Sequence, residues 1–131
     1  MRSSSICLLT AAVFVVSLAV PMLAGGETRT VTGELIEMNC YARMGGNAVG
    51  ADHAECALRC AQGGAPLGIL TADEEIISII GEMTNDENAQ LLEFVGKNVR
   101  ATGEFTEDGG GPGTTVVGKD GMIDVTSIEL Q

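Results

Sequence analysis

Three of the four cysteines and the only histidine of the chain lie within one short stretch. Residues 39–62 read NCYARMGGNAVGADHAECALRCAQ, and their soft ligand side chains are Cys40, His53, Cys56 and Cys60. Thiolates with an imidazole are ligands that zinc prefers, and thiolates also suit copper(I). The spacing Cys-x12-His-x2-Cys-x3-Cys matches no standard zinc-finger pattern and lacks the Cys-x2-Cys-His of haem attachment. We predict that the four residues form one Cys3His site for copper or zinc.

A short helix is expected to carry three of these ligands. Asp52 followed by Glu55 has the spacing of a capping box, and Gly63 with Gly64 provides a stop signal. Within such a helix, Glu55 and Arg59 would form an ion pair on the face toward water.

The predicted helix would place its three ligands on one face. His53, Cys56 and Cys60 fall at positions i, i+3 and i+7, within an arc of about 60°. Cys40 is expected at the end of the first strand. The glycine-rich loop at 44–51 can bend freely enough to return the chain over Cys40.

Two methionines near Cys40 are further candidate ligands. Met38 and Met44 flank it on either side. Thioether sulfur binds copper(I) but hardly zinc, so these residues tilt the expected ion toward copper.

Two other readings of the cysteines stay open. An exported protein usually pairs its cysteines, so a Cys40 disulfide to Cys56 or Cys60 would staple the insertion to the barrel and leave one thiol over. Alternatively, Cys56 in the first turn of a helix, next to His53, would be a reactive thiolate that Cys60 resolves.

Five segments carry the apolar patterns and turn signals of β-strands. They are 29–38, 67–72, 75–80, 98–106 and 121–130. Gly33 is expected to bend the first strand. Thr84 followed by Glu87 predicts a helix that ends at Gly96. The face of this helix expected to be buried in the barrel consists of Leu91, Phe94 and Val95.

The element order predicts a mainly β fold. Apart from a helical insertion at 39–64, it is the order of a five-stranded Greek-key barrel with a helix between the third and fourth strands, the OB-fold. The segments VTGELIEMNCY, GAPLGILTADEEIISI, GKNVRATGEFTEDGG and GMIDVTSIEL resemble small secreted bacterial OB-fold proteins that carry a Cys/His insertion after the first strand. This resemblance spans residues 27–131 and implies the barrel, but it brings no established activity.

The first 26 residues have the layout of a secretory signal peptide. Arg2 precedes an apolar run at 6–20, and small residues lead up to Glu27. Cleavage before Glu27 would leave 105 residues, enough for a single domain at 27–131. We therefore expect a periplasmic or secreted protein that has no membrane contact after cleavage.

The charge of the chain excludes several function classes. Outside the predicted signal peptide, 18 acidic residues face six basic ones, a formal charge of −12 that repels nucleic acid and anionic lipids. The single histidine is assigned to the metal, which leaves no general base for a serine hydrolase. We predict a monomeric, non-catalytic binding protein whose candidate partners are a metal ion and another exported protein.

Overall fold

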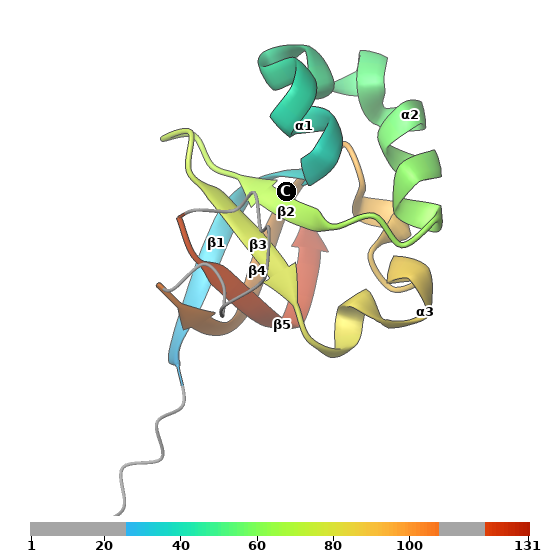
Figure 1. Cartoon of the computed structure of the whole chain (residues 1–131). Coiled ribbons are helices and arrows are strands. Elements are labelled where there is room, and N and C mark those ends of the chain that lie inside the picture. Colours follow the sequence, from blue (N-terminus) through green and yellow to red (C-terminus); the bar gives the residue numbers. More distant parts are fainter. Residues whose placement is uncertain (1–25, 108–119) are drawn as a thin grey trace, which may run out of the picture.

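The computed structural model of the chain describes residues 26–107 and 120–131. Five strands form a closed barrel in the order β1-β2-β3-β5-β4, and β1 also pairs with β4 (Figure 1). Only β3 and β5 are parallel among the pairs described. The strands are β1 (Glu27–Glu37), β2 (Leu67–Leu70), β3 (Ile76–Ile80), β4 (Asn98–Thr106) and β5 (Met122–Leu130). This OB-fold-like barrel confirms the predicted fold class.

The predicted signal peptide lies, except for Gly26, outside the described residues. Among the helices of the described part, none is both long and apolar enough to cross a membrane.

The barrel closes through β1, which changes partner along its length. Residues 27–34 pair with β4, and residues 34–37 pair with β2. The change occurs at Gly33 and Glu34, where the sequence predicts a bend. A side chain at Gly33 would collide with the carbonyl oxygen of Leu70, so only glycine allows the strands to approach this closely.

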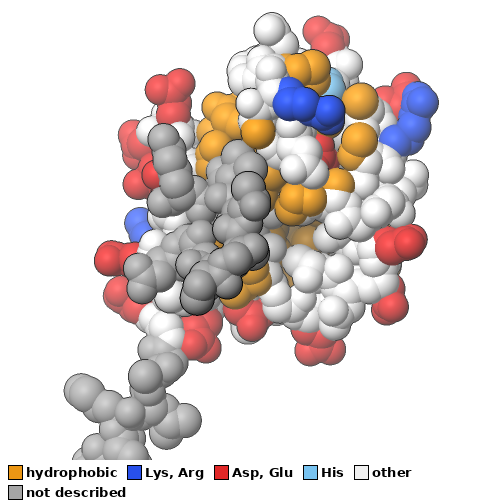
Figure 2. Space-filling view, in the orientation of Figure 1, with side chains coloured by type: hydrophobic (Ala, Val, Ile, Leu, Met, Phe, Trp, Pro, Cys, Tyr) orange, Lys and Arg blue, Asp and Glu red, His pale blue; other side chains and the backbone are white. Residues whose placement is uncertain are grey.

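The side chains on the inward face of each strand fill the barrel and form the main core. In β4, burial alternates residue by residue, as expected for a strand with one face in the core. Its inward side chains Val99, Ala101 and Phe105 pack with Leu35 of β1 and Ile123 of β5. On the outside, Figure 2 shows Asp and Glu side chains around much of the visible surface, in keeping with the charge of the chain.

The insertion between β1 and β2 contains two helices rather than one. They are α1 (Met38–Met44) and α2 (Ala51–Gln62), joined by the 3₁₀ turn η1 (Gly45–Ala48). Figure 1 shows the two helices side by side above the barrel. The prediction that Cys40 ends the first strand is therefore wrong, because β1 ends at Glu37 and Cys40 lies in α1. The carboxylate of Glu37 accepts the N–H groups of Asn39 and Cys40, and this cap starts a helix directly after β1.

The predicted cap of α2 is also wrong, because the N-cap is Gly50 instead of Asp52. Gly50 has a φ of 78°, which glycine adopts without strain, and its N–H donates to the Glu34 carboxylate at 2.6 Å. The helix can therefore begin earlier, and Asp52 lies in its first turn. The predicted ion pair on the outer face is confirmed, with Arg59 at 2.6 Å from Glu55.

The chain between β3 and β4 is not the single helix that the sequence predicts. It consists of the short elements η2 (Glu82–Thr84), α3 (Asn85–Asn88) and η3 (Leu92–Phe94). The Thr84 hydroxyl donates back to the Gly81 carbonyl instead of capping forward. Asp86, Glu87 and Asn88 all have positive φ, which interrupts the helix.

Tertiary contacts explain this interruption. The buried Asn88 side chain donates to the carbonyl oxygen of Ala61 in the last turn of α2, at 2.9 Å, and to that of Ala65 in the loop after it, at 3.0 Å. Leu91 and Val95 are buried as predicted, whereas Phe94 is only partly buried.

Candidate metal centre

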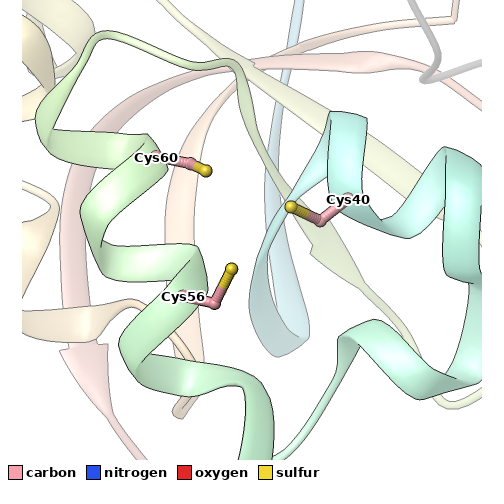
Figure 3. Close-up of side chains that lie close together, drawn as sticks. All are labelled: Cys40, Cys56 and Cys60. Carbon is pink, nitrogen blue, oxygen red and sulfur yellow. The ribbon is translucent and has the colours of Figure 1, made fainter.

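The sulfur atoms of Cys40, Cys56 and Cys60 all lie within 4.8 Å of one another. Figure 3 shows Cys40 projecting from α1 and the other two from neighbouring turns of α2, so that the three sulfurs face a common point between the helices. All three cysteines are free thiols. If each sulfur stands at about 2.3 Å from a shared ion in one plane, the sulfurs lie about 4 Å apart. The observed spacing fits such a three-sulfur site.

Cys40 is held by the first turn of α1. Its N–H donates to Oε2 of Glu37 at 2.8 Å, and the N–H of Met38 donates to the Pro66 carbonyl at 3.0 Å. The Cys40 side chain is buried. Thus the end of β1 and the loop before β2 together position this sulfur.

Cys56 and Cys60 are held by the packing of α2 on the barrel. Ala57 and Ala61, which follow them directly in sequence, are buried in the main core. Asn88 secures the end of the same helix. Cys56 is exposed and Cys60 is half-buried, so an ion would reach the site from the side of Cys56.

His53 does not belong to the close group of ligand atoms found in the described residues. It lies on α2 one turn before Cys56 and is half-buried. Its Nε2 atom is buried and has no hydrogen-bond partner within the described part of the chain. A buried nitrogen usually has a partner, so this atom is free to accept a bond from a proton donor or a metal.

The two methionines occupy different surroundings. Met38 is buried in a small second core with Ile36 and Ile76, and its sulfur lies against Gly68 of β2. Met44, at the end of α1, is exposed. Their predicted role as copper ligands stays a prediction.

Glu37 is the residue of the site that the sequence analysis missed. It is buried, lies in contact with Cys40, and is the carboxylate nearest that cysteine along the chain. Glutamate is not a preferred N-cap residue, so nothing in the local sequence indicated that a helix begins after Glu37.

The Cys40 thiol keeps its proton well above neutral pH in the metal-free protein. A hydrogen bond with Glu37, burial and the negative charge of Glu37 raise its pKa from 9.0 to about 12, and Cys60 adds to the effect. A metal that binds Cys40 at neutral pH must therefore displace its proton.

This shift predicts a loss of stability at alkaline pH. The folded pKa exceeds the unfolded value of 9.0, so the stabilisation is complete below pH 9 and is lost as the pH rises toward 12. By pH 10 the loss from this thiol should be about 1.4 kcal/mol. Denaturant unfolding of the reduced, chelator-treated protein at pH 8 and pH 10 measures it.

Two variants identify the thiol responsible. In Cys40→Ala, the fall in unfolding free energy between pH 8 and pH 10 that this thiol causes should disappear. In Cys56→Ala the fall should remain, because Cys56 is exposed. An equal loss in Cys40→Ala and the wild type would contradict the assignment.

The reading of Cys56 as a thiolate activated by the helix terminus loses its main support. Because α2 begins at Ala51, Cys56 is in the second turn of the helix, and the effect of the helix dipole fades beyond the first turn.

Comparison of the chain with models of protein families, with curated proteins and with solved structures finds no match. The three-cysteine cluster is therefore the feature on which a function has to be argued.

Proposed function

We propose that this protein is an exported, non-catalytic binding protein that holds one copper(I) or zinc ion between α1 and α2. The observation that carries the proposal is the convergence of three cysteine sulfurs, from two helices, to within 4.8 Å. Thiolates are strong ligands for both ions.

The two ions would use the site differently. Copper(I) is satisfied by two or three sulfurs, which the cysteines supply. Zinc in a structural site takes four ligands. We propose that His53 is the fourth, because it lies one turn from Cys56 and its Nε2 has no competing partner in the described residues.

The exposure of Cys56 supports binding that is open to exchange. An ion held by one buried, one half-buried and one exposed cysteine is accessible to a donor or acceptor from the outside. An exported protein that hands its ion to another exported protein would need such access.

Native mass spectrometry of the exported protein tests this function. After reduction and removal of bound metal, it should take up one equivalent of copper(I) or zinc. Proton release should accompany binding at neutral pH, because the Cys40 thiol must lose its proton. The same spectra give the N-terminus, which we expect near Glu27.

The disulfide reading predicts a different result from the same sample. Protein purified without reductant would carry one bridge from Cys40 and one thiol that can be alkylated. If the reduced protein then binds neither ion, the cysteines form a covalent staple and the proposal is wrong. A bridge that exchanges readily with an added dithiol, again without metal affinity, would favour thiol redox chemistry.

A further inference from the structure

At the end of β1, the carboxylate of Glu37 lies beside Cys40 and has no ion-pair partner in the described residues. Its side chain is only 1% exposed. Oε1 accepts the Asn39 N–H at 2.9 Å and Oε2 accepts the Cys40 N–H at 2.8 Å. Neither of the two ion pairs in the described residues involves Glu37. A buried charge that has no cation is costly, so its place next to a cysteine cluster requires an explanation.

We infer that Glu37 is a specificity-determining residue of the three-cysteine site, which orients Cys40 and favours a divalent over a monovalent ion. The inference rests on the proposed function, because it concerns the ion held by the same sulfurs. Glu37 is not itself assigned as a ligand, because its oxygens do not belong to the close group of ligand atoms that the three cysteines form in the described residues.

The physical basis is the dependence of electrostatic attraction on the charge of the ion. Glu37 attracts zinc, with two positive charges, twice as strongly as copper(I), with one. Its repulsion of the three thiolates is the same with either ion and therefore cancels in the ratio of the two affinities. As a general scale, two unit charges about 6 Å apart at an effective dielectric constant of about 20 interact strongly enough to change an affinity by about a hundredfold.

A purely positional role would act differently. If Glu37 only started α1, its loss would move Cys40 and lower the affinities for both ions by a similar factor. The ratio of the zinc affinity to the copper(I) affinity separates the two roles, whereas neither affinity alone does so.

The test compares wild type with Glu37→Gln, which removes the charge and keeps the size of the side chain. Both affinities are measured by competition with chelators of known strength. We expect the ratio of zinc to copper(I) affinity to fall by about tenfold to a hundredfold in Glu37→Gln. An unchanged ratio overturns the inference.

A matched control is available on the same strand. Glu34→Gln also removes a carboxylate that accepts a backbone N–H within the insertion, that of Gly50. Glu34 is not among the groups that act on the Cys40 thiol. The affinity ratio should therefore stay at its wild-type value in Glu34→Gln, and an equal fall in both variants overturns the inference.

A second pair of variants covers the case in which Glu37→Gln does not fold. Aspartate and asparagine are equally good N-caps, so Glu37→Asp and Glu37→Asn should both start α1 while differing by one charge. The ratio should be higher in Glu37→Asp than in Glu37→Asn, and equal ratios overturn the inference. Wild type that binds neither ion would instead remove the proposed function, and the inference with it.

Discussion

Replacing Cys60 by serine should lower the affinity of the reduced protein for its ion by about a hundredfold to a thousandfold. Structural zinc sites with four ligands have apparent binding free energies of about 10–16 kcal/mol, so one ligand accounts for about 2.5–4 kcal/mol. A serine hydroxyl keeps its proton at neutral pH and cannot replace the thiolate. Chelator competition with the reduced protein measures the loss.

Neighbouring variants show whether the sulfurs act as one site. Cys56→Ser should cause a loss of the same order, although Cys56 is exposed, because its sulfur belongs to the same group. Met44→Leu alters an exposed sulfur on α1 and should leave zinc affinity unchanged. Serine variants that bind as tightly as wild type would exclude these cysteines from an ion site.

His53→Ala distinguishes the two coordination schemes within the same experiment. If His53 completes a four-ligand zinc site, the variant should lose much of its zinc affinity and little of its copper(I) affinity. An unchanged affinity for both ions would leave the three sulfurs as the protein's ligand set.

Leu91→Ala should lower the free energy of unfolding by about 2–5 kcal/mol. Truncating a fully buried leucine removes apolar contact and leaves a cavity that the surroundings fill only in part. Leu91 is 0% exposed and lies in the main core, in the segment between β3 and β4. Denaturant unfolding of the metal-free protein at neutral pH measures the change.

The adjacent Leu92 is the matched control. It is only partly buried, so the same leucine-to-alanine change should cost clearly less. The comparison with Phe94→Ala is informative as well. The sequence predicts a fully buried Phe94 and hence a loss of about 3–5 kcal/mol, whereas its partial burial predicts a smaller one. Equal losses of unfolding free energy in Leu91→Ala and Leu92→Ala would mean that Leu91 is not packed in the core of the barrel.

The strands of the barrel were predictable because their signals are local. Alternating apolar residues in β4 and the apolar runs of β2 and β3 specify which side chains are buried, and the turns between them limit each strand. Gly33 marked the place where β1 changes partner. With five strands of this order, the OB-fold connectivity follows.

The helices were less predictable because tertiary contacts override their local signals. The Thr84–Glu87 pattern predicts a helix, yet the Asn88 side chain donates to carbonyls in the last turn of α2 and in the loop after it, more than twenty residues earlier in sequence. Likewise, α1 begins because the buried carboxylate of Glu37 satisfies two N–H groups. A capping pattern read from sequence contains no information about such distant partners.

By itself, the sequence determined that Cys56 and Cys60 share a helix face and that soft ligands are concentrated after the first strand. Helical periodicity imposes the first, since residues four apart lie one turn above each other. Only the tertiary structure decided that the Cys40 sulfur meets them, that His53 lies outside the close group, and that Glu37 is buried against Cys40. These depend on how α1 and α2 pack on the barrel, and packing is a property of the whole core rather than of any local pattern.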